Sequence, residues 1–580
     1  MKILLVHPEN SLDSVRSQDG WDLVIDLGWA GEHAYREWSR RLGCPVRGFY
    51  GFGWGPEDFL RVAEILNPCR GILVDADGLD WWEILAPLRI QEMLQLVLAR
   101  RVKSEVRATE LVGTRLHPIA ELLARVTGLE IRYLETRAEP VWRGRVRRWR
   151  TALRRMTPGD LLQVALDKWD ADYRLRSRLA RRAAGGSGAV LLPSGYINVT
   201  RVLQAYARLL PEREFLLVTT RKSGTMVGLP ENVRSVSLAG YAGELSDAAQ
   251  GEARNLERAW VRLEHGPLRA GEKIALAHQS GWFGEIGRTF GRWLRIRDAW
   301  KCVLDKEHIS AVLCGDENSP TNRIPLLLAG RRELPTVHCD HGSLNILLPL
   351  RGLACDHYLV KGEMERDFVA RTFPVAAGRI VVGAPPASSG GSADANAKRG
   401  TGPGTGGSGT IVFFSEQHEL TLGRIRVLYE ELLPGLCDLA RRHGTRVTVK
   451  LHPFESPASR GRLLDAVLSA EQRGLVDLVH GPLTDALLAD MWFGVTVESS
   501  VAVDCTIRGI PCFVCQWFAQ PLTGYIDQFV RYGAGFGLAS PEEIAGIPER
   551  LAGARITEEI RLGLWNVIEP ARLDGLLQKS

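Results

Sequence analysis

Short runs of apolar and β-branched residues alternate with longer stretches in which apolar positions recur every three or four residues. The short runs predict strands and the longer stretches predict helices. Because a helix separates each strand from the next, the strands should form parallel sheets joined by right-handed crossovers. In the last third of the chain we expect strands at 410–414, 446–451, 475–479, 493–497 and 511–515, and helices at 423–442, 459–472, 482–490 and 500–508.

The same alternation runs through the first two thirds of the chain. Residues 81–185 look mainly helical, and a long polar helix is expected at about 285–306. The expected strands are 2–6, 23–26, 71–74, 190–193, 214–218, 233–238, 311–314, 336–339, 357–360 and 379–382.

A segment rich in Gly, Ser and Pro, 385–410, is a flexible linker by composition. It separates an N-terminal Rossmann-like domain, 1–384 with a helical insertion at about 81–185, from a C-terminal one, 411–540. A helical segment, 541–580, follows. The predicted fold class is therefore α/β, with two Rossmann-like domains and a central cleft. Ligands of such sheets lie beyond the carboxyl ends of the strands.

The composition narrows the class of protein. The chain has 580 residues, of which 45% are hydrophobic and 24% charged, and this excludes a disordered chain. No apolar run approaches the roughly 18 residues of a membrane-spanning helix, and we expect the first ten residues to begin a strand rather than a signal peptide. The scattered cysteines are typical of reduced thiols, so a cytoplasmic location is expected.

Charge is mild overall but uneven. The net charge of +5 does not indicate a nucleic-acid partner. Arginines gather in 142–182, where they interleave with Trp142 and Trp149. This region is either a solvated helix face or a surface that touches anionic lipid or a lipid-linked acceptor at the inner face of a membrane.

The strongest candidate chemistry lies at two strand ends in the C-terminal domain. One strand runs into Lys450, His452 and a proline, and a later strand runs into Ser499 and Ser500 at the start of a helix. A cation, an imidazole and the amides and hydroxyls of a helix start would bind an anion such as a departing phosphate. The plainer alternatives are a structural histidine and an ordinary helix cap.

Acidic and imidazole groups end two strands of the N-terminal domain. Asp340, His341 and Gly342 follow one strand, and Asp316 and Glu317 follow the strand before it. A transferase needs a group that deprotonates the acceptor hydroxyl, and Asp340 is the first choice, before Asp316 and Glu317. Each could instead be a polar residue that merely ends a strand.

Three weaker motifs are open to plainer interpretations. Asp75 and Asp77 could hold a divalent metal, but a turn is the favoured interpretation and we expect no metal site. Asn198 could cap a helix and face the acceptor. Cys512 and Cys515 have zinc-like spacing, but they would point to opposite faces of a strand.

At Lys450-Leu-His452-Pro453 and Ser499-Ser500 the chain resembles GT-B glycosyltransferases that use CMP-activated sugars, namely bacterial sialyl-, polysialyl- and Kdo transferases. Gly509-Ile510-Pro511 fits as well. The resemblance covers about 410–520 and, more loosely, 308–384. The acidic-Glu-Gly triplet of some of these enzymes is absent here.

The resemblance implies that His452 assists departure of the donor phosphate, that Ser499 and Ser500 bind it, and that Lys450 lies near the nucleotide. Ser415 and Gln417 could line the same pocket, and His341, Gly342 and Asn198 would lie on the acceptor side. The expected function is transfer of a sugar, most simply a CMP-linked acidic sugar, to a glycan of capsule or lipopolysaccharide, without a cofactor. The alternatives are a CDP-alcohol polyol-phosphate transferase, a non-catalytic nucleotide-binding subunit of a polysaccharide assembly complex, and a nucleotide-sugar epimerase.

Overall fold

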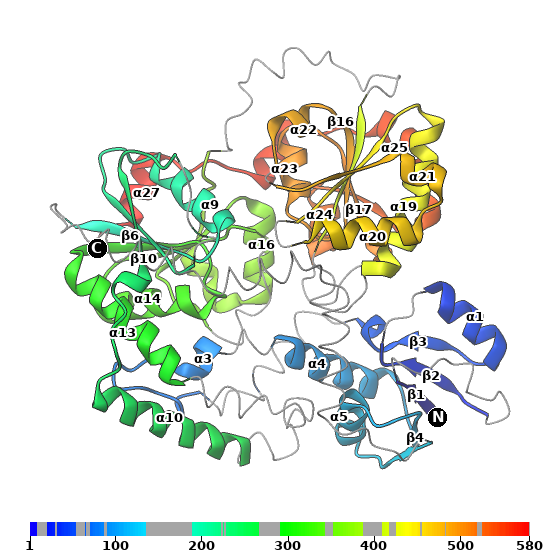
Figure 1. Ribbon diagram of the computed structural model, residues 1–580, viewed down its shortest axis with the longest axis horizontal. Helices are drawn as coiled ribbons and strands as arrows, with labels where there is room; N and C mark the ends of the chain where they lie inside the picture. The colour runs from blue at the N-terminus through cyan, green and yellow to red at the C-terminus, as the bar shows by residue number, and fades with distance from the viewer. Residues whose placement is uncertain are drawn as a thin grey trace.

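The structure is a computed structural model (Figure 1). Gln417, the Arg-rich region 142–182 and most of the predicted linker lie outside the residues that it describes. The described residues are 1–7, 20–28, 32–53, 64, 70–85, 90–134, 188–221, 224, 228–265, 290–342, 352–386, 409–416, 425–452, 455–481, 483–518 and 525–578.

The described residues form three parallel sheets, each packed with helices. The second and third sheets belong to the two Rossmann-like domains that the sequence predicts, and the α/β class is confirmed. The first sheet was not predicted as a separate unit.

The first sheet has the order β3-β2-β1-β4-β5. Residues 1–384 therefore hold two sheets rather than one, and the expected helical insertion contributes two strands, β4 and β5. The strands are Lys2–Val6 (β1), Leu23–Asp26 (β2), Val46–Gly48 (β3), Glu110–Gly113 (β4) and Ile131–Tyr133 (β5), and the helices are Glu32–Leu42 (α1), Trp81–Leu85 (α3), Ile90–Glu105 (α4) and Pro118–Thr127 (α5).

The strand expected at 71–74 is wrong. Only Val74 makes a bridge there, an antiparallel one to Asp80. The backbone turns back on itself at this point, because Trp81 N donates to Leu73 O (2.9 Å) and Asp75 N donates to Leu79 O (3.0 Å). Gly78, with φ of 77°, provides the left-handed conformation that this turn requires.

The second sheet has the order β12-β11-β10-β9-β6-β7-β8, so the strand order reverses between β6 and β9. Its strands are Ala189–Ser194 (β6), Phe215–Thr219 (β7), Val233–Ser237 (β8), Ile309–Cys314 (β9), Thr336–Cys339 (β10), His357–Val360 (β11) and Ile380–Val382 (β12). Its helices are Ile197–Ala207 (α9), Asp247–His265 (α10), Phe290–Lys306 (α13), Pro320–Arg331 (α14) and Glu363–Thr372 (α16).

The third sheet has the order β15-β14-β13-β16-β17-β18, with the reversal between β13 and β16. Its strands are Thr410–Phe414 (β13), Val447–Lys450 (β14), Val476–Val479 (β15), Met491–Thr496 (β16), Cys512–Cys515 (β17) and Phe536–Leu538 (β18). Its helices are Ile425–Arg442 (α19), Pro457–Val467 (α20), Ala470–Gly474 (α21), Asp485–Ala489 (α22), Val501–Ile507 (α23) and Tyr525–Arg531 (α24).

The C-terminal segment returns from the third-sheet domain to the second-sheet domain, where α27 (red) lies in Figure 1. Ala384 N donates to Asn566 O (2.7 Å) and Ile568 N donates to Ala384 O (2.9 Å). Ile568 and Leu573 are buried in the core of the second-sheet domain. The helices of this segment are Ile547–Gly553 (α25), Glu558–Leu564 (α26) and Pro570–Leu576 (α27).

The same two domains also contact each other directly through α16 and α24. Gln528 Nε2 donates to Met364 O (3.0 Å), and Arg371 donates to Gln528 Oε1 (2.6 Å). These hydrogen bonds join the second-sheet and third-sheet domains.

Candidate functional site

Lys450 is the last residue of β14, and its side chain is buried. Its ammonium donates to two backbone carbonyls, Leu451 O at 2.9 Å and Gly481 O at 2.7 Å. Among the described residues, no carboxylate lies within salt-bridge distance of it. Burial lowers the pKa of Lys450. The charge of Glu455 offsets part of this fall. A buried cation whose described hydrogen-bond partners are carbonyls favours an anion placed beside it.

His452 follows β14 in a loop that Glu455 holds in place. The backbone N–H of His452 donates to Glu455 Oε2 at 2.7 Å, and Arg460 forms a buried ion pair with Glu455 at 2.6 Å. Burial, and then the charge of Lys450, lowers the pKa of His452 to about 4. The imidazole is therefore neutral near pH 7 and can donate one ring N–H to a ligand.

Ser415 directly follows β13, as the sequence predicts. It is buried, and its hydroxyl lies 2.9 Å from Glu455 Oε1 and 3.0 Å from the hydroxyl of Tyr429. These contacts support the loop that carries His452.

Ser499 and Ser500 lie between β16 and α23, as expected, and Ser500 is the N-cap of the helix. The hydroxyl of Ser500 makes no capping hydrogen bond there. The residues just before this helix start bind inside the protein. Glu416 Oε1 accepts from Thr496 Oγ1 (2.9 Å), Glu498 N (2.9 Å) and Val497 N (3.3 Å).

The acidic residues after β9 are less available than the sequence suggests. Glu317 forms a buried ion pair with Arg323 at 2.9 Å, and both side chains are at most 1% exposed. Asp316 Oδ1 accepts from the amides of Asn318 (3.1 Å) and Ser319 (3.3 Å), which lead into α14. The ion pair with Arg323 neutralises Glu317. The carboxylate of Asp316 accepts the amides of its own turn. We therefore consider neither residue well placed to act as a base.

Asp340 follows β10 and is bound more loosely. Its Oδ1 accepts from Gly342 N at 3.3 Å and its Oδ2 accepts from the hydroxyl of Tyr358 at 3.5 Å. Both distances are long for hydrogen bonds. Of the three acidic candidates, Asp340 is the one with the weakest internal bonds.

His341 lies at the strand-order reversal of the second sheet. Its Nδ1 donates to Gly315 O at 2.6 Å, so Nε2 is left to accept from the hydroxyl of Tyr196. Burial, with the nearby charges of Asp316 and Asp340, raises the pKa of Tyr196, which stays a phenol. The sequence analysis did not single out Tyr196.

Asn198 does not cap its helix. The N-cap of α9 is Tyr196, and Asn198 is the second residue of the helix. Its half-buried side chain remains a candidate for the acceptor side.

Two charge interactions connect the facing edges of these domains. Burial lowers the pKa of Lys450, Glu455 partly offsets this, and Arg201 on α9 of the other domain lowers it further. The second interaction joins Lys361 of the second-sheet domain to Asp504 on α23 of the third-sheet domain. Burial raises the pKa of Asp504, and Arg508 and Lys361 partly offset that rise. The sequence analysis did not identify Arg201 as a residue of this site.

The Asp-x-Asp motif is confirmed as a turn. Asp75 pairs with Arg297 at 3.0 Å, and Asp77 pairs with Arg297 at 3.1 Å and with Lys301 at 2.6 Å. Across the described part of the chain, no group of three or more His, Cys, Asp or Glu side chains could hold a metal ion. The cysteines there, Cys512 and Cys515 included, are free thiols.

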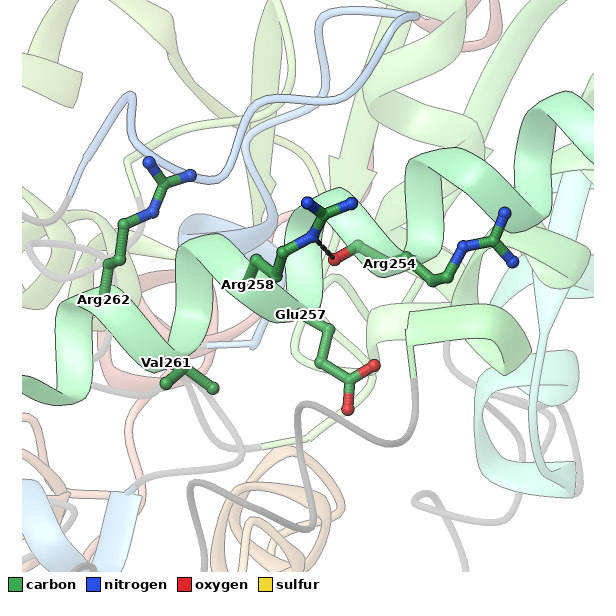
Figure 2. Close-up of a pocket in the computed structure, with 5 residues that line it drawn as sticks. All are labelled: Arg254, Glu257, Arg258, Val261 and Arg262. Atoms are coloured by element: carbon green, nitrogen blue, oxygen red, sulfur yellow. Dashed lines mark hydrogen bonds between the residues drawn. The ribbon is translucent and has the colours of Figure 1, made fainter.

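An open pocket lies along α10 (Figure 2). Its described lining residues all come from that helix, and none is a predicted site residue: Arg254, Glu257, Arg258, Val261 and Arg262. No helix in the described ranges is long and apolar enough to cross a membrane.

No protein-family model matches the chain. No curated protein matches it either. Among solved structures, it is similar to S. aureus MnaA in a co-structure with UDP, at 12% identity, with 67% of this chain and 95% of that chain covered and a TM-score of 0.42.

Two further solved structures are similar. One is UDP-GlcNAc 2-epimerase from Neisseria meningitidis bound to UDP-GlcNAc, at 13% identity, 67% and 99% coverage and a TM-score of 0.41. The other is CalG4, the calicheamicin glycosyltransferase, at 14% identity, 68% and 99% coverage and a TM-score of 0.38. At these values the likenesses carry no argument about function, which rests on the side chains described above.

Proposed function

We propose that the protein is a GT-B glycosyltransferase that moves a sugar from a nucleotide-activated donor to a glycan acceptor. The observation that carries this proposal is the buried ammonium of Lys450, which donates to two backbone carbonyls and has no carboxylate within salt-bridge distance among the described residues. Glu455 attracts this charge from further away, but burial outweighs it and the pKa of Lys450 is lowered. It lies at the carboxyl end of β14, where parallel sheets of this kind bind ligands. An anionic ligand would complete its environment.

The donor phosphate would lie among the side chains at this edge. Lys450 and Arg201 supply positive charge, and the neutral imidazole of His452 donates a hydrogen bond. As the bond between the sugar carbon and the phosphate oxygen breaks, its electron pair moves onto the phosphate, and these groups stabilise the charge that develops there. In this proposal the cations of the chain, rather than a metal ion, neutralise that charge.

A single phosphate suits the site better than a diphosphate. Glu416 already fills part of the turn after β16, so the hydroxyls of Ser499 and Ser500 are the donors left beside it. This favours a nucleoside-monophosphate donor, and CMP is the carrier that the sequence resemblance implies.

The acceptor would lie at the edge of the second sheet. We assign Asp340 as the base because its hydrogen bonds are long, whereas Glu317 is neutralised by Arg323. Asp340 would take the proton of the acceptor hydroxyl as that oxygen attacks the sugar carbon. His341 and Tyr196, which are bonded to each other, would position the acceptor. By the same resemblance, the acceptor is a glycan of a bacterial surface polysaccharide.

Thermal denaturation of the full chain with CMP, CDP, UDP, GDP or ADP tests the proposal. A nucleotide that binds only the folded state raises the melting temperature by an amount set by its concentration and Kd. We expect CMP to give the largest increase. A preference for UDP or GDP would overturn the CMP assignment, and the absence of any increase would overturn the transferase proposal.

A further inference from the structure

Glu416 occupies a special position in the third sheet. It follows β13, and the strand order of this sheet reverses between β13 and β16. In open α/β sheets, the crevice at such a reversal is where ligands bind. Here the side chain of Glu416 binds across that reversal, from the end of β13 to the residues that end and follow β16.

Three donors converge on one oxygen of this carboxylate. The hydroxyl of Thr496 and the amide of Glu498 both lie 2.9 Å from Glu416 Oε1, and the amide of Val497 lies at 3.3 Å. Burial raises the pKa of Glu416, and the hydrogen bonds from these donors and from the amide of Ser499 partly offset that rise. These donors lie 80 to 82 positions after Glu416 in the sequence. The chain continues from them directly into Ser499 and Ser500.

The turn is therefore shaped around an internal anion. A carboxylate presents the same kind of acceptor oxygen as a phosphate, and it satisfies amides that would otherwise be orphaned at the end of β16. Because these amides point at Glu416, they do not point at the donor. Ser499 and Ser500 follow one and two residues further on, at the start of α23.

We propose that Glu416 is a positioning residue that fixes the turn after β16, so that Ser499 and Ser500 meet the donor phosphate with their hydroxyls. This inference rests on the proposed function. A positioning role differs from a purely structural role, because loss of the Glu416 carboxylate should lower the nucleotide affinity of the folded protein.

The test uses Glu416→Ala with and without sodium formate, a small carboxylate that can enter the space left by the side chain. We expect Glu416→Ala to bind CMP roughly tenfold more weakly than the natural chain, as for the loss of one hydrogen-bonded anchor. Formate should restore most of the affinity. Glu416→Gln, which keeps an acceptor oxygen, should lie between the two and serves if the Ala variant does not fold.

Glu431→Ala is the matched control, since Glu431 lies on α19 of the same domain and accepts from Trp517 Nε1 at 3.1 Å. We expect this variant to bind CMP normally, with or without formate. Unchanged affinity in folded Glu416→Ala would overturn the inference. Tighter binding would also overturn it, because Glu416 would then compete with the phosphate for the amides.

Hydrogen exchange separates this inference from the proposed function. If the natural chain binds no nucleotide, the proposed function fails, and the role of Glu416 is judged from the amides of Val497 and Glu498. We expect these amides to exchange faster in Glu416→Ala and to slow again in formate. Unchanged exchange would show that Glu416 does not shape the turn.

Discussion

Two buried lysines end strands in the two Rossmann-like domains, and they are neutralised differently. Lys361 follows β11 and pairs with Glu365 at 3.0 Å, and its ammonium also donates to Gly342 O. Burial alone would lower the pKa of Lys361, but the carboxylates of Glu365 and Asp340 outweigh it and the pKa is raised. Lys450 ends β14, donates to two carbonyls, and has a lowered pKa.

This difference indicates that Lys361 is a structural cation and that Lys450 is a candidate for binding an anionic ligand. The charge of Lys361 is balanced inside the protein, close to Asp340. The charge of Lys450 has no carboxylate within salt-bridge distance in the described ranges, and it lies beside His452. Glu455 offsets only part of the burial of Lys450, since the pKa is still lowered. A buried cation without an ion-pair partner opposes folding, so a ligand explains this edge better than stability does.

The largest expected effect is a difference in the free energy of unfolding when each lysine is replaced by methionine. Lys361→Met should lower the free energy of unfolding by about 3–5 kcal/mol, because it leaves Glu365 buried without its partner. Lys450→Met should change it by less than about 1 kcal/mol, because no partner carboxylate is stranded. Urea denaturation at pH 7 measures both.

The double variant Lys361→Met/Glu365→Leu is the control for that measurement. Replacing both partners by apolar residues should recover most of the lost stability. Equal losses in the two single Met variants would mean that the lysines do not differ as described.

The next effect concerns the edge that carries Lys450. His452→Ala should reduce sugar transfer by about 100-fold or more while the chain stays folded, since the departing phosphate loses a hydrogen-bond donor. Transfer is measured as nucleotide release in the presence of acceptor. His443→Ala is the matched control, because His443 is an exposed histidine at the opposite edge of the same sheet. Near-normal activity of His452→Ala would remove this imidazole from the mechanism.

A smaller effect follows from the pKa of His452. This pKa is about 4 in the folded chain and about 6.5 when unfolded, so unfolding takes up a proton between these values. Stability should therefore fall as the pH falls from 6.5 toward 4, with a contribution from His452 of about 1–2 kcal/mol between pH 7 and pH 5. The natural chain and His452→Asn are compared by urea denaturation at both pH values. An identical pH dependence in the two chains would contradict the lowered pKa.

The sequence predicted where the strands end, and with them the positions of Lys450, His452, Ser499 and Ser500. It could not predict what the polar side chains bind. Glu416 is paired with amides 82 positions away, and such a partner depends on which strands lie side by side. For the same reason, the ion pair of Glu317 and the hydrogen bond between Tyr196 and His341 appear only in the folded chain.

The sequence predicted β1 and β2 of the first sheet but missed its other three strands because they are short. Val46–Gly48, Glu110–Gly113 and Ile131–Tyr133 have three or four residues each, too few for an alternating pattern to stand out. The apolar run at 71–74 resembles a strand equally well, but the tight turn beside Gly78 folds it back on itself.

The most direct measurement is calorimetric titration of CMP into the natural chain and into Lys450→Met, both folded at pH 7. If Lys450 is the binding cation, its loss should weaken CMP binding by about 10- to 100-fold, as expected for a hydrogen bond to a charged group. An unchanged Kd in the folded Lys450→Met variant would contradict a phosphate site at the end of β14.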